Sequence, residues 1–414
     1  MSGPSAAERR VARIATAVIV AGIALRLVLV FALPFGQQVR HRLEGLNDEP
    51  AHFRYIQELA VHHAFPVQTA RFGSPGTWQR LDFGFYQPPL YYLMGAGLYA
   101  VVGPANALHA CRLLSALCGL ATLLVLWRVL RASPLPRLMA LATVAFASLY
   151  LTHAYFCAVA SNDALSWLLA ALVIERMLAL AGGPSAGAPP SPGRGMSLAA
   201  LLAASALTKS SLLVLFPLVA LVYAAEAVRR RSVRFGVEGL VVLVAAVLIA
   251  HPWYVLNLHR YGSLFAFDMG FGPPRTEGVS GSSLLGVLSG TSRYFWFPMQ
   301  HVKPSSLARL ARAGGMVVLL LHLLAAAVWL ARRPASAREA WLALTFTVVL
   351  IGYVRFNLTW SDPEARYLFP AFVPMMYGLA AGAWGTLGRT RWATLGAIEI
   401  LALSAIPFVF LALV

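Results

Sequence analysis

Nine consecutive residues near position 50 combine side chains that can move protons or bind a metal. The segment reads Asn47-Asp48-Glu49-Pro50-Ala51-His52-Phe53-Arg54-Tyr55. On a helix, Asp48 and His52 share one face, and Tyr55 lies next along it. A carboxylate beside an imidazole can act as a general base or ligate a divalent metal. The same residues also make an ordinary helix start, with Asn47 or Asp48 as N-cap, so both interpretations stay open at this point.

Later segments carry polar side chains within or beside long apolar stretches. These residues are Gln87, Arg112, Asn162, Asp163, Lys209, Asn257, Asp362, Glu364 and Arg366. Ionisable groups at membrane depth are costly and usually line a cavity or pathway, so we expect these segments to converge on Asp48. Plainer alternatives exist for three of them. Asp163 can help cap a helix, Lys209 can snorkel from a helix end, and Arg366 can pair with Glu364 or Asp362.

The composition indicates a membrane protein. Of 414 residues, 59% are hydrophobic and 12% are charged, whereas soluble domains carry about a quarter charged residues. The apolar blocks approach the ~20 residues that cross a bilayer. The net charge of +17 is mostly arginine, which we interpret first as cytoplasmic loop charge and then as binding of lipid phosphate. No soluble basic patch interleaved with aromatic residues indicates nucleic-acid binding.

The arginine clusters predict the topology. Arg9, Arg10 and Arg13 place the amino terminus inside, and the later clusters lie inside only if Pro88–Gly103 is a juxtamembrane helix and not a span. The predicted spans are 11–35, 109–130, 137–157, 163–182, 196–208, 210–227, 235–255, 314–331, 339–356, 367–386 and 392–413. The chain is thus expected to form a single membrane domain, 1–414, with about eleven spans and outer loops at 34–108 and 256–313. No internal repeat is evident, which weakens a transporter interpretation.

Six short motifs, in order along the chain, resemble the lipid-dependent GT-C glycosyltransferases, which include protein O-mannosyltransferases and lipid A aminoarabinose transferases. The motifs are Asp48-Glu49, Gln87-Pro88-Pro89-Leu90-Tyr91-Tyr92, Arg112-Leu113-Leu114-Ser115, Ser161-Asn162-Asp163-Ala164-Leu165, Thr208-Lys209-Ser210 and Glu364-Ala365-Arg366-Tyr367-Leu368. The resemblance implies an all-α polytopic GT-C-like bundle with juxtamembrane helices in the first outer loop.

The resemblance also implies an activity, namely transfer of a sugar from a polyprenyl-phosphate-linked donor to an acceptor at the outer face. Because no sizeable soluble domain follows the last predicted helix, a lipid, glycan or polymer acceptor is favoured. Asp48 is the expected general base, with Glu49 beside it as a second catalytic or supporting carboxylate. Lys209, Arg112 and Arg366 are candidates for the lipid phosphate. A divalent metal at Asp48, Glu49 and His52 is left open.

The remaining predicted substrate contacts come from the same motifs. They are His52, Tyr55, Gln87, Arg112, Asn162, Asp163, Lys209, Glu364, Arg366 and Tyr367. The expected location is the bacterial cytoplasmic membrane, with the amino terminus cytoplasmic and the site extracytoplasmic. The competing hypothesis is a transporter or flippase of lipid-linked sugars, which would place ionisable residues near the bilayer centre.

Overall fold

The computed structural model describes most of the chain. The described residues are 5–35, 38–39, 42–43, 48–76, 80–182, 192–275, 280–296, 298, 305–332, 336–360, 362–387 and 393–406. The alternative N-cap Asn47 lies outside them, as do residues 392 and 407–413 of the predicted span 392–413.

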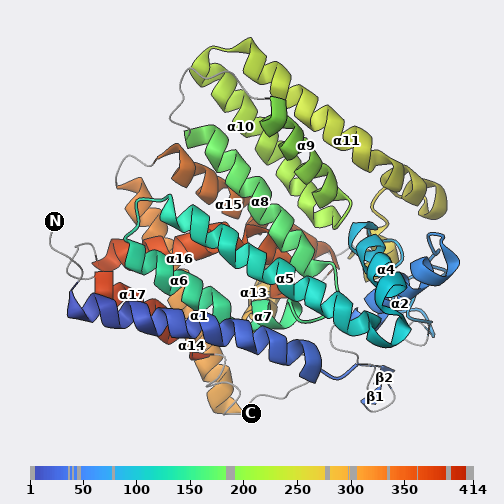
Figure 1. The fold of residues 1–414 in the computed structure, drawn as a ribbon, viewed down its shortest axis with the longest axis horizontal. Coiled ribbons are helices and arrows are strands. Elements are labelled where there is room, and N and C mark those ends of the chain that lie inside the picture. Colours follow the sequence, from blue (N-terminus) through green and yellow to red (C-terminus); the bar gives the residue numbers. More distant parts are fainter. Residues whose placement is uncertain are drawn as a thin grey trace.

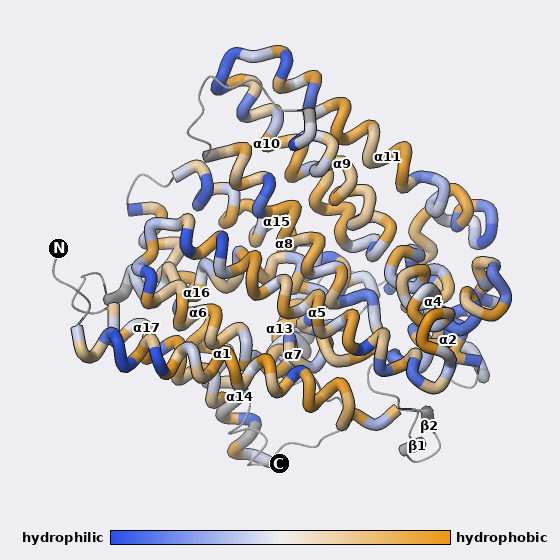
Figure 2. The backbone as a smooth tube through the Cα atoms, viewed as in Figure 1, coloured by the Kyte–Doolittle hydropathy of each residue, from blue (hydrophilic) through white to orange (hydrophobic). Residues whose placement is uncertain are grey.

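The described part of the chain contains eight helical segments that are long and apolar enough to cross a membrane. They are Ala6–Ala32, Pro104–Arg131, Asp163–Ala181, Ser210–Arg230, Val233–Tyr261, Arg312–Ala331, Ala337–Trp360 and Ala365–Gly385. Figure 2 shows hydrophobic residues along these helices and hydrophilic residues gathered towards the ends of many of them. The fold is therefore an all-α polytopic bundle, as the sequence predicts, whereas the count of eleven spans stays a prediction.

A set of helices forms the bundle. In chain order they are α1 (Ala6–Ala32), α5 (Pro104–Arg131), α6 (Arg137–Leu149), α7 (Leu151–Phe156), α8 (Asp163–Gly182), α9 (Pro192–Ala206), α10 (Leu215–Arg230), α11 (Val233–Tyr261), α14 (Ser306–Ala331), α15 (Ala337–Trp360), α16 (Phe372–Leu387) and α17 (Ala393–Leu403). The 3-10 segments η2 (Ser210–Val214) and η3 (Ala365–Ala371) lead into α10 and α16.

Smaller elements gather at one end of the bundle, where the site lies. They are the pair β1 (Gln38–Val39) and β2 (Arg42–Leu43), α2 (Glu49–His62), α4 (Leu90–Val102), α12 (Phe267–Phe271) and α13 (Gly281–Phe295). Figure 1 shows α2 and α4 together at this end, with the amino terminus of α1 at the opposite end. The 13-residue α4 is too short for an ideal span, in keeping with the predicted juxtamembrane helix. The Leu90 amide donates to the Leu207 carbonyl at 2.8 Å, which ties α4 to the end of α9.

One predicted helix is divided. The sequence predicts a single helix over 137–157, but the backbone leaves helical geometry at Tyr150, between α6 and α7. The guanidinium of Arg26, fully buried on α1, stabilises this break, because it donates to the carbonyl of Ser148 and contacts Nδ1 of His153 at 2.8 Å. The break was missed because no proline or glycine marks it.

Small residues let the helices approach closely. A Cβ at Gly22 of α1 would clash with the backbone carbonyl of Ser148 at the end of α6. A Cβ at Gly382 of α16 would clash in the same way with the carbonyl of His322 on α14. Membrane helices gain little from hydrophobic burial against lipid, so such close van der Waals contact is an important source of their association.

Candidate active site

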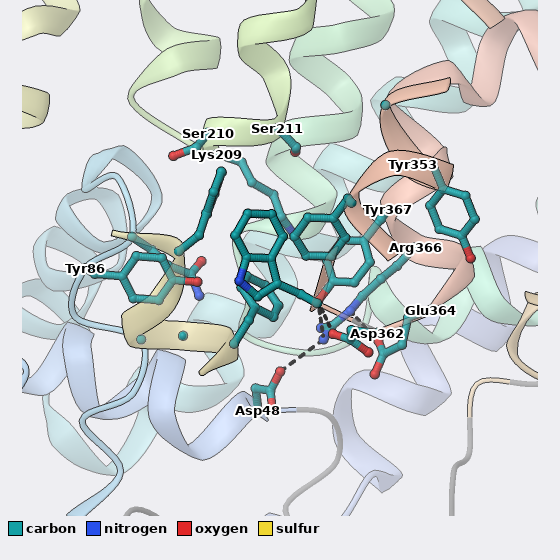
Figure 3. Close-up of a pocket in the computed structure, with 18 of the residues that line it drawn as sticks. Asp48, Tyr86, Lys209, Ser210, Ser211, Tyr353, Asp362, Glu364, Arg366 and Tyr367 are labelled. Carbon is teal, nitrogen blue, oxygen red and sulfur yellow. Dashed lines mark hydrogen bonds and ion pairs between the residues drawn. The ribbon is translucent and has the colours of Figure 1, made fainter. Parts of the chain in front are cut away.

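A cavity of about 690 Å³ lies where the smaller elements at one end of the protein meet the bundle. Segments far apart in the sequence contribute to its wall, including α2, η2, α12, α15 and the segment around η3. Figure 3 shows Tyr86 on one side, Asp362 and Glu364 on the other, and Asp48 between them. The cavity is charged at one part of its wall and aromatic at another. Its charged lining residues are Asp48, Lys209, Arg355, Asp362, Glu364 and Arg366.

The guanidinium of Arg366 organises the charged part. Each of its three nitrogens pairs with a different carboxylate: Nη2 with Asp48 at 3.0 Å, Nη1 with Asp163 at 3.3 Å, and Nε with Glu364 at 2.5 Å. These acids come from the start of α2, the start of α8 and the residue before η3. The side chain of Arg366 is only 5% exposed, so it holds the three segments together in a dry environment.

Asp48 opens α2 and lines the cavity, and it has an unusual backbone conformation. Its φ of 62° is left-handed, a region in which aspartate and asparagine are the best-tolerated residues after glycine. The side chain makes no capping hydrogen bond to the helix. It pairs with Arg366 instead, with 34% of its surface exposed. Asp48 is thus at the N-cap position, but its carboxylate is directed to the charged cluster.

Glu49 has different surroundings from its neighbour. Nε and Nη2 of Arg112 donate hydrogen bonds to its two carboxylate oxygens at 2.7 and 2.6 Å, and the backbone amide of Ala160 donates a further one to Oε1 at 2.7 Å. Both side chains of the ion pair are 1% exposed, and neither is among the residues that line the cavity. Arg112 also donates to the carbonyls of Val30 and Leu33 at 3.1 and 2.8 Å. This pair therefore joins α1, α2 and α5 behind the site.

Lys209 and Arg355 are the cavity cations that contact fewer partners. Lys209 Nζ pairs with Asp163 and lies 5.3 Å from the ring centre of Tyr367, which leaves donor capacity on the ammonium. Arg355 is exposed on α15, and no ion pair of its side chain is found within the described parts of the chain. Arg355 was not predicted as a site residue, because an arginine at the end of a span is usually a topology signal.

A chain of hydrogen bonds leads from His52 into the bundle. Nδ1 of His52 lies 2.7 Å from the hydroxyl of Tyr92, which donates to Oε1 of Gln87 at 3.1 Å. Nδ2 of Asn162 donates to the same oxygen at 2.8 Å and to the carbonyl of Thr208 at 3.0 Å. Burial lowers the pKa of His52 to about 4, so the ring is neutral at pH 7. His52 and Gln87 line the cavity, whereas Asn162 supports them from behind.

Tyr55 is fully buried and lies outside the cavity wall. Its ring stacks on that of Tyr92 with centres 4.1 Å apart, and its hydroxyl donates to the carbonyl of Gln87 at 3.5 Å. The helix that carries Tyr55 does begin at Asp48, as the sequence predicts, but the contacts of Tyr55 are packing contacts within the protein. Its assignment as a substrate contact stays a prediction.

The segment before η3 places two further acids at the cavity. Asp362 accepts a hydrogen bond from the hydroxyl of Tyr367 at 2.8 Å, and burial raises the pKa of Asp362. Burial also raises the pKa of Glu364, to about 8. Asp362, Asp48 and Asp163 act in the same direction, while the guanidinium of Arg366 opposes them. The carboxyl group of Glu364 is therefore protonated more readily than that of an ordinary glutamate, even though it lies beside a cation.

Aromatic residues from the two long loops and from α15 form the rest of the wall. The loops contribute Phe72, Phe83, Tyr86, Phe267 and Phe271, and α15 contributes Phe356 and Trp360. Nδ2 of Asn257 donates to the Tyr86 carbonyl at 2.9 Å, and Nε2 of Gln68 donates to the Met269 carbonyl at 2.7 Å, which joins the first loop to α11 and α12. The indole Nε1 of Trp360 has no hydrogen-bond partner in the described part of the chain. None of these aromatic residues was predicted as a site residue, because the sequence offers no signal for them beyond their place in the loops or at the end of a helix.

The residues expected to ligate a divalent metal do not form a ligand set. No group of three His, Cys, Asp or Glu side chains that could hold a metal occurs among the described residues. The oxygens of Glu49 are taken by Arg112 and Ala160, Oδ2 of Asp48 by Arg366, and Nδ1 of His52 by Tyr92. This arrangement of Asp48, Glu49 and His52 does not fit a divalent ion.

The fold is similar to that of solved oligosaccharyltransferase structures. The Archaeoglobus fulgidus oligosaccharyltransferase complex with Zn and sulfate matches with a TM-score of 0.52 and 13% identity, over 95% of this chain and 52% of that one. The archaeal enzyme AglB, in complex with an inhibitory peptide and a dolichol-phosphate, matches with a TM-score of 0.53 and 11% identity, over 96% and 55%. This chain thus spans about half the length of the oligosaccharyltransferase.

ArnT from Cupriavidus metallidurans bound to undecaprenyl phosphate gives a TM-score of 0.41 and 17% identity, over 95% of this chain and 78% of that one. No family model matches the sequence, and a search of curated proteins gave no significant match. The oligosaccharyltransferase comparison confirms the predicted all-α polytopic fold.

Proposed function

We propose that the chain is a glycosyltransferase that moves a sugar from a polyprenyl-phosphate-linked donor to a lipid, glycan or polymer acceptor. The observation that carries the proposal is the single cavity that brings Asp48, Lys209, Arg355 and a wall of aromatic side chains together in a GT-C fold. The solved AglB structure with a dolichol-phosphate supports a lipid phosphate as part of the donor.

Asp48 is proposed as the general base. A hydroxyl is a poor nucleophile at neutral pH, so a carboxylate must take its proton as the new bond to the anomeric carbon forms. Asp48 suits this role because it lines the cavity and is 34% exposed. Glu49 is enclosed by Arg112 and is proposed to position Asp48. Without a covalent intermediate, direct displacement by the acceptor inverts the anomeric centre.

Lys209 and Arg355 are proposed to bind the donor phosphate. The leaving group carries negative charge that grows as the bond to the sugar breaks, and fixed cations stabilise it. Arg366 already pairs with three carboxylates, so its main proposed role is to orient Asp48. Arg112, as a partner of Glu49, is proposed to support the site from behind.

The aromatic wall is proposed to hold the sugar and the first part of the lipid. Trp and Tyr combine an apolar ring with a polar group, which suits a ligand that is partly apolar and partly hydroxylated. Tyr86 and Trp360 each offer such a group at the cavity, and Val349 and Phe356 of α15 continue an apolar surface. His52 and Gln87 are proposed to contact sugar hydroxyls from the opposite part of the wall.

The site is proposed to lie at the extracytoplasmic face of a bacterial cytoplasmic membrane. The arginines at the start of α1 and at the α10–α11 turn support a cytoplasmic location for those ends. In Figure 1 the start of α1 lies at the end of the bundle opposite to α2 and α4.

Asp48→Asn in purified protein tests the assignment. Asparagine tolerates the left-handed backbone of this position, so the fold is expected to remain. With a polyprenyl-phosphate sugar as donor, kcat should fall by roughly 10²–10⁴-fold while donor binding is retained. Glu58→Gln on the same helix is the matched control, because Glu58 pairs only with Arg54 and His62 away from the cavity.

Three outcomes would contradict the proposal. Full turnover by Asp48→Asn would remove Asp48 as the base. Movement of lipid-linked sugar across vesicles, without transfer to an acceptor, would favour the flippase hypothesis. Absence of both activities in the wild-type protein, over a panel of lipid-linked hexoses and pentoses, would reject the donor class.

A further inference from the structure

Asp48 is joined to a second acid of the cavity through one side chain. Arg366 contacts Asp48 with Nη2 and Glu364 with Nε, at 3.0 and 2.5 Å. Both carboxyl groups line the cavity. The guanidinium group is planar and rigid, so the two acids are held in a defined arrangement around it.

The balance of charges at the cavity favours the neutral, protonated form of one of the acids. Three acids and three cations line the wall, and Asp163 adds a fourth carboxylate behind it. A bound lipid phosphate brings further negative charge to the same place. A carboxylate facing this phosphate would repel it, whereas a carboxylic acid would donate a hydrogen bond to it.

We propose that Glu364 is the general acid of the transfer and donates its proton to the phosphate oxygen that leaves the sugar. This inference rests on the proposed function. The acceptor oxygen forms its bond to the anomeric carbon and gives its proton to Asp48. The bond between the anomeric carbon and the phosphate oxygen breaks, its electron pair stays on that oxygen, and the proton of Glu364 moves to it. The products are the glycosylated acceptor and a protonated polyprenyl phosphate.

The step leaves the charge around Arg366 unchanged. Before it, Asp48 is ionised and Glu364 is neutral; after it, Asp48 is neutral and Glu364 is ionised. One negative charge therefore moves from one side of the guanidinium to the other, and both sites contact it directly. A buried cation with a constant number of ionised partners avoids the cost of an unpaired charge during the reaction. Transfer of a proton from Asp48 to Glu364 then resets the site.

The surroundings favour the protonated form of Glu364. The groups that face it include Arg366, Tyr367 and Asp362 on its own segment, Asp48 of α2, Asp163 of α8, Tyr155 of α7 and Tyr353 of α15. Burial raises the pKa of Glu364 to about 8 against the opposing effect of Arg366. The acid must be protonated to act, so activity is present below this pKa and is lost as the pH rises through it.

The pH dependence of kcat in wild-type protein, Glu364→Gln and Glu364→Asp tests the inference. Wild type should lose activity above about pH 8. Glu364→Gln keeps the size of the side chain but has no acidic proton, so its kcat should be about 10²-fold lower and show no fall in this range. Glu364→Asp should retain a fall at alkaline pH with a smaller loss of kcat, because it keeps the acid at a shorter reach.

A second measurement separates proton donation from mere positioning of Arg366. A donor whose phosphate carries an electron-withdrawing aryl ester needs less protonation to leave. The defect of Glu364→Gln should shrink at least tenfold with this donor, an effect that a displaced Arg366 would not produce.

An unchanged fall of kcat at alkaline pH in Glu364→Gln, or an equal defect of this variant with both donors, would overturn the inference and leave the proposed function intact. If Glu364→Gln does not fold, a wild-type profile that is flat between pH 7 and 10 would overturn it. Wild-type protein with no transfer from any polyprenyl-phosphate sugar would reject the proposed function itself.

Discussion

Glu49→Gln should destabilise the protein strongly, although it removes only a charge. Glu49 and Arg112 are each 1% exposed, and two short hydrogen bonds join them. Breaking a buried ion pair by removing one partner costs about 3–5 kcal/mol, because the other charge stays buried without compensation. Arg112 keeps its bonds to the carbonyls of Val30 and Leu33, and glutamine can still accept from the Ala160 amide. These contacts place the expected loss near the lower value, about 3 kcal/mol.

Reversible unfolding of the purified protein in mixed detergent micelles measures this loss. Glu58→Gln is again the matched control, because Glu58 is on the same helix and its partner Arg54 is 49% exposed. That control should change the free energy of unfolding by less than about 1 kcal/mol. A loss below about 1 kcal/mol in Glu49→Gln would refute the view that Glu49 and Arg112 clamp the site from behind.

Two other substitutions test the cavity and the packing beneath it. Arg355→Gln should weaken binding of the polyprenyl-phosphate donor about tenfold, worth roughly 1.4 kcal/mol, and titration with the unreactive lipid phosphate checks it. Unchanged affinity would remove Arg355 from the phosphate site. Gly22→Leu should lower the midpoint of thermal unfolding or prevent folding, because its Cβ would meet the Ser148 carbonyl. A wild-type midpoint would show that α1 and α6 can separate at no cost.

The sequence predicted the bundle well because its signals are strong and local. Apolar blocks of span length and arginine-rich turns each act over about twenty residues, so most of the long apolar helices could be inferred directly. The division between α6 and α7 could not, since it depends on Arg26 from a helix more than a hundred residues away. Arg26 itself appears in the sequence as one charge in an otherwise apolar run.

The sequence indicated several residues of the site, but not which side chains form ion pairs with one another. Asp48 and Arg366, which their types and their order in the motifs indicated as site residues, both line the cavity. Nothing in the sequence distinguishes Asp48 from Glu49 as the acid that faces the cavity, because that depends on which of them Arg112 reaches. The aromatic wall, including Trp360, was missed because tryptophan is common at the ends of membrane helices for reasons unrelated to ligands.

The triple contact of Arg366 has a consequence for how the protein is made. Arg366 follows its partner Asp48 by 318 positions and its partner Asp163 by 203 positions. At about 5–20 residues per second, a ribosome needs roughly 15–60 s to extend the chain from Asp48 to Arg366. During this interval Asp163 can already pair with Lys209, whereas Asp48 has to remain without its guanidinium partner until η3 is made. Chains truncated before Arg366 are therefore expected to hold α2 less firmly against the bundle.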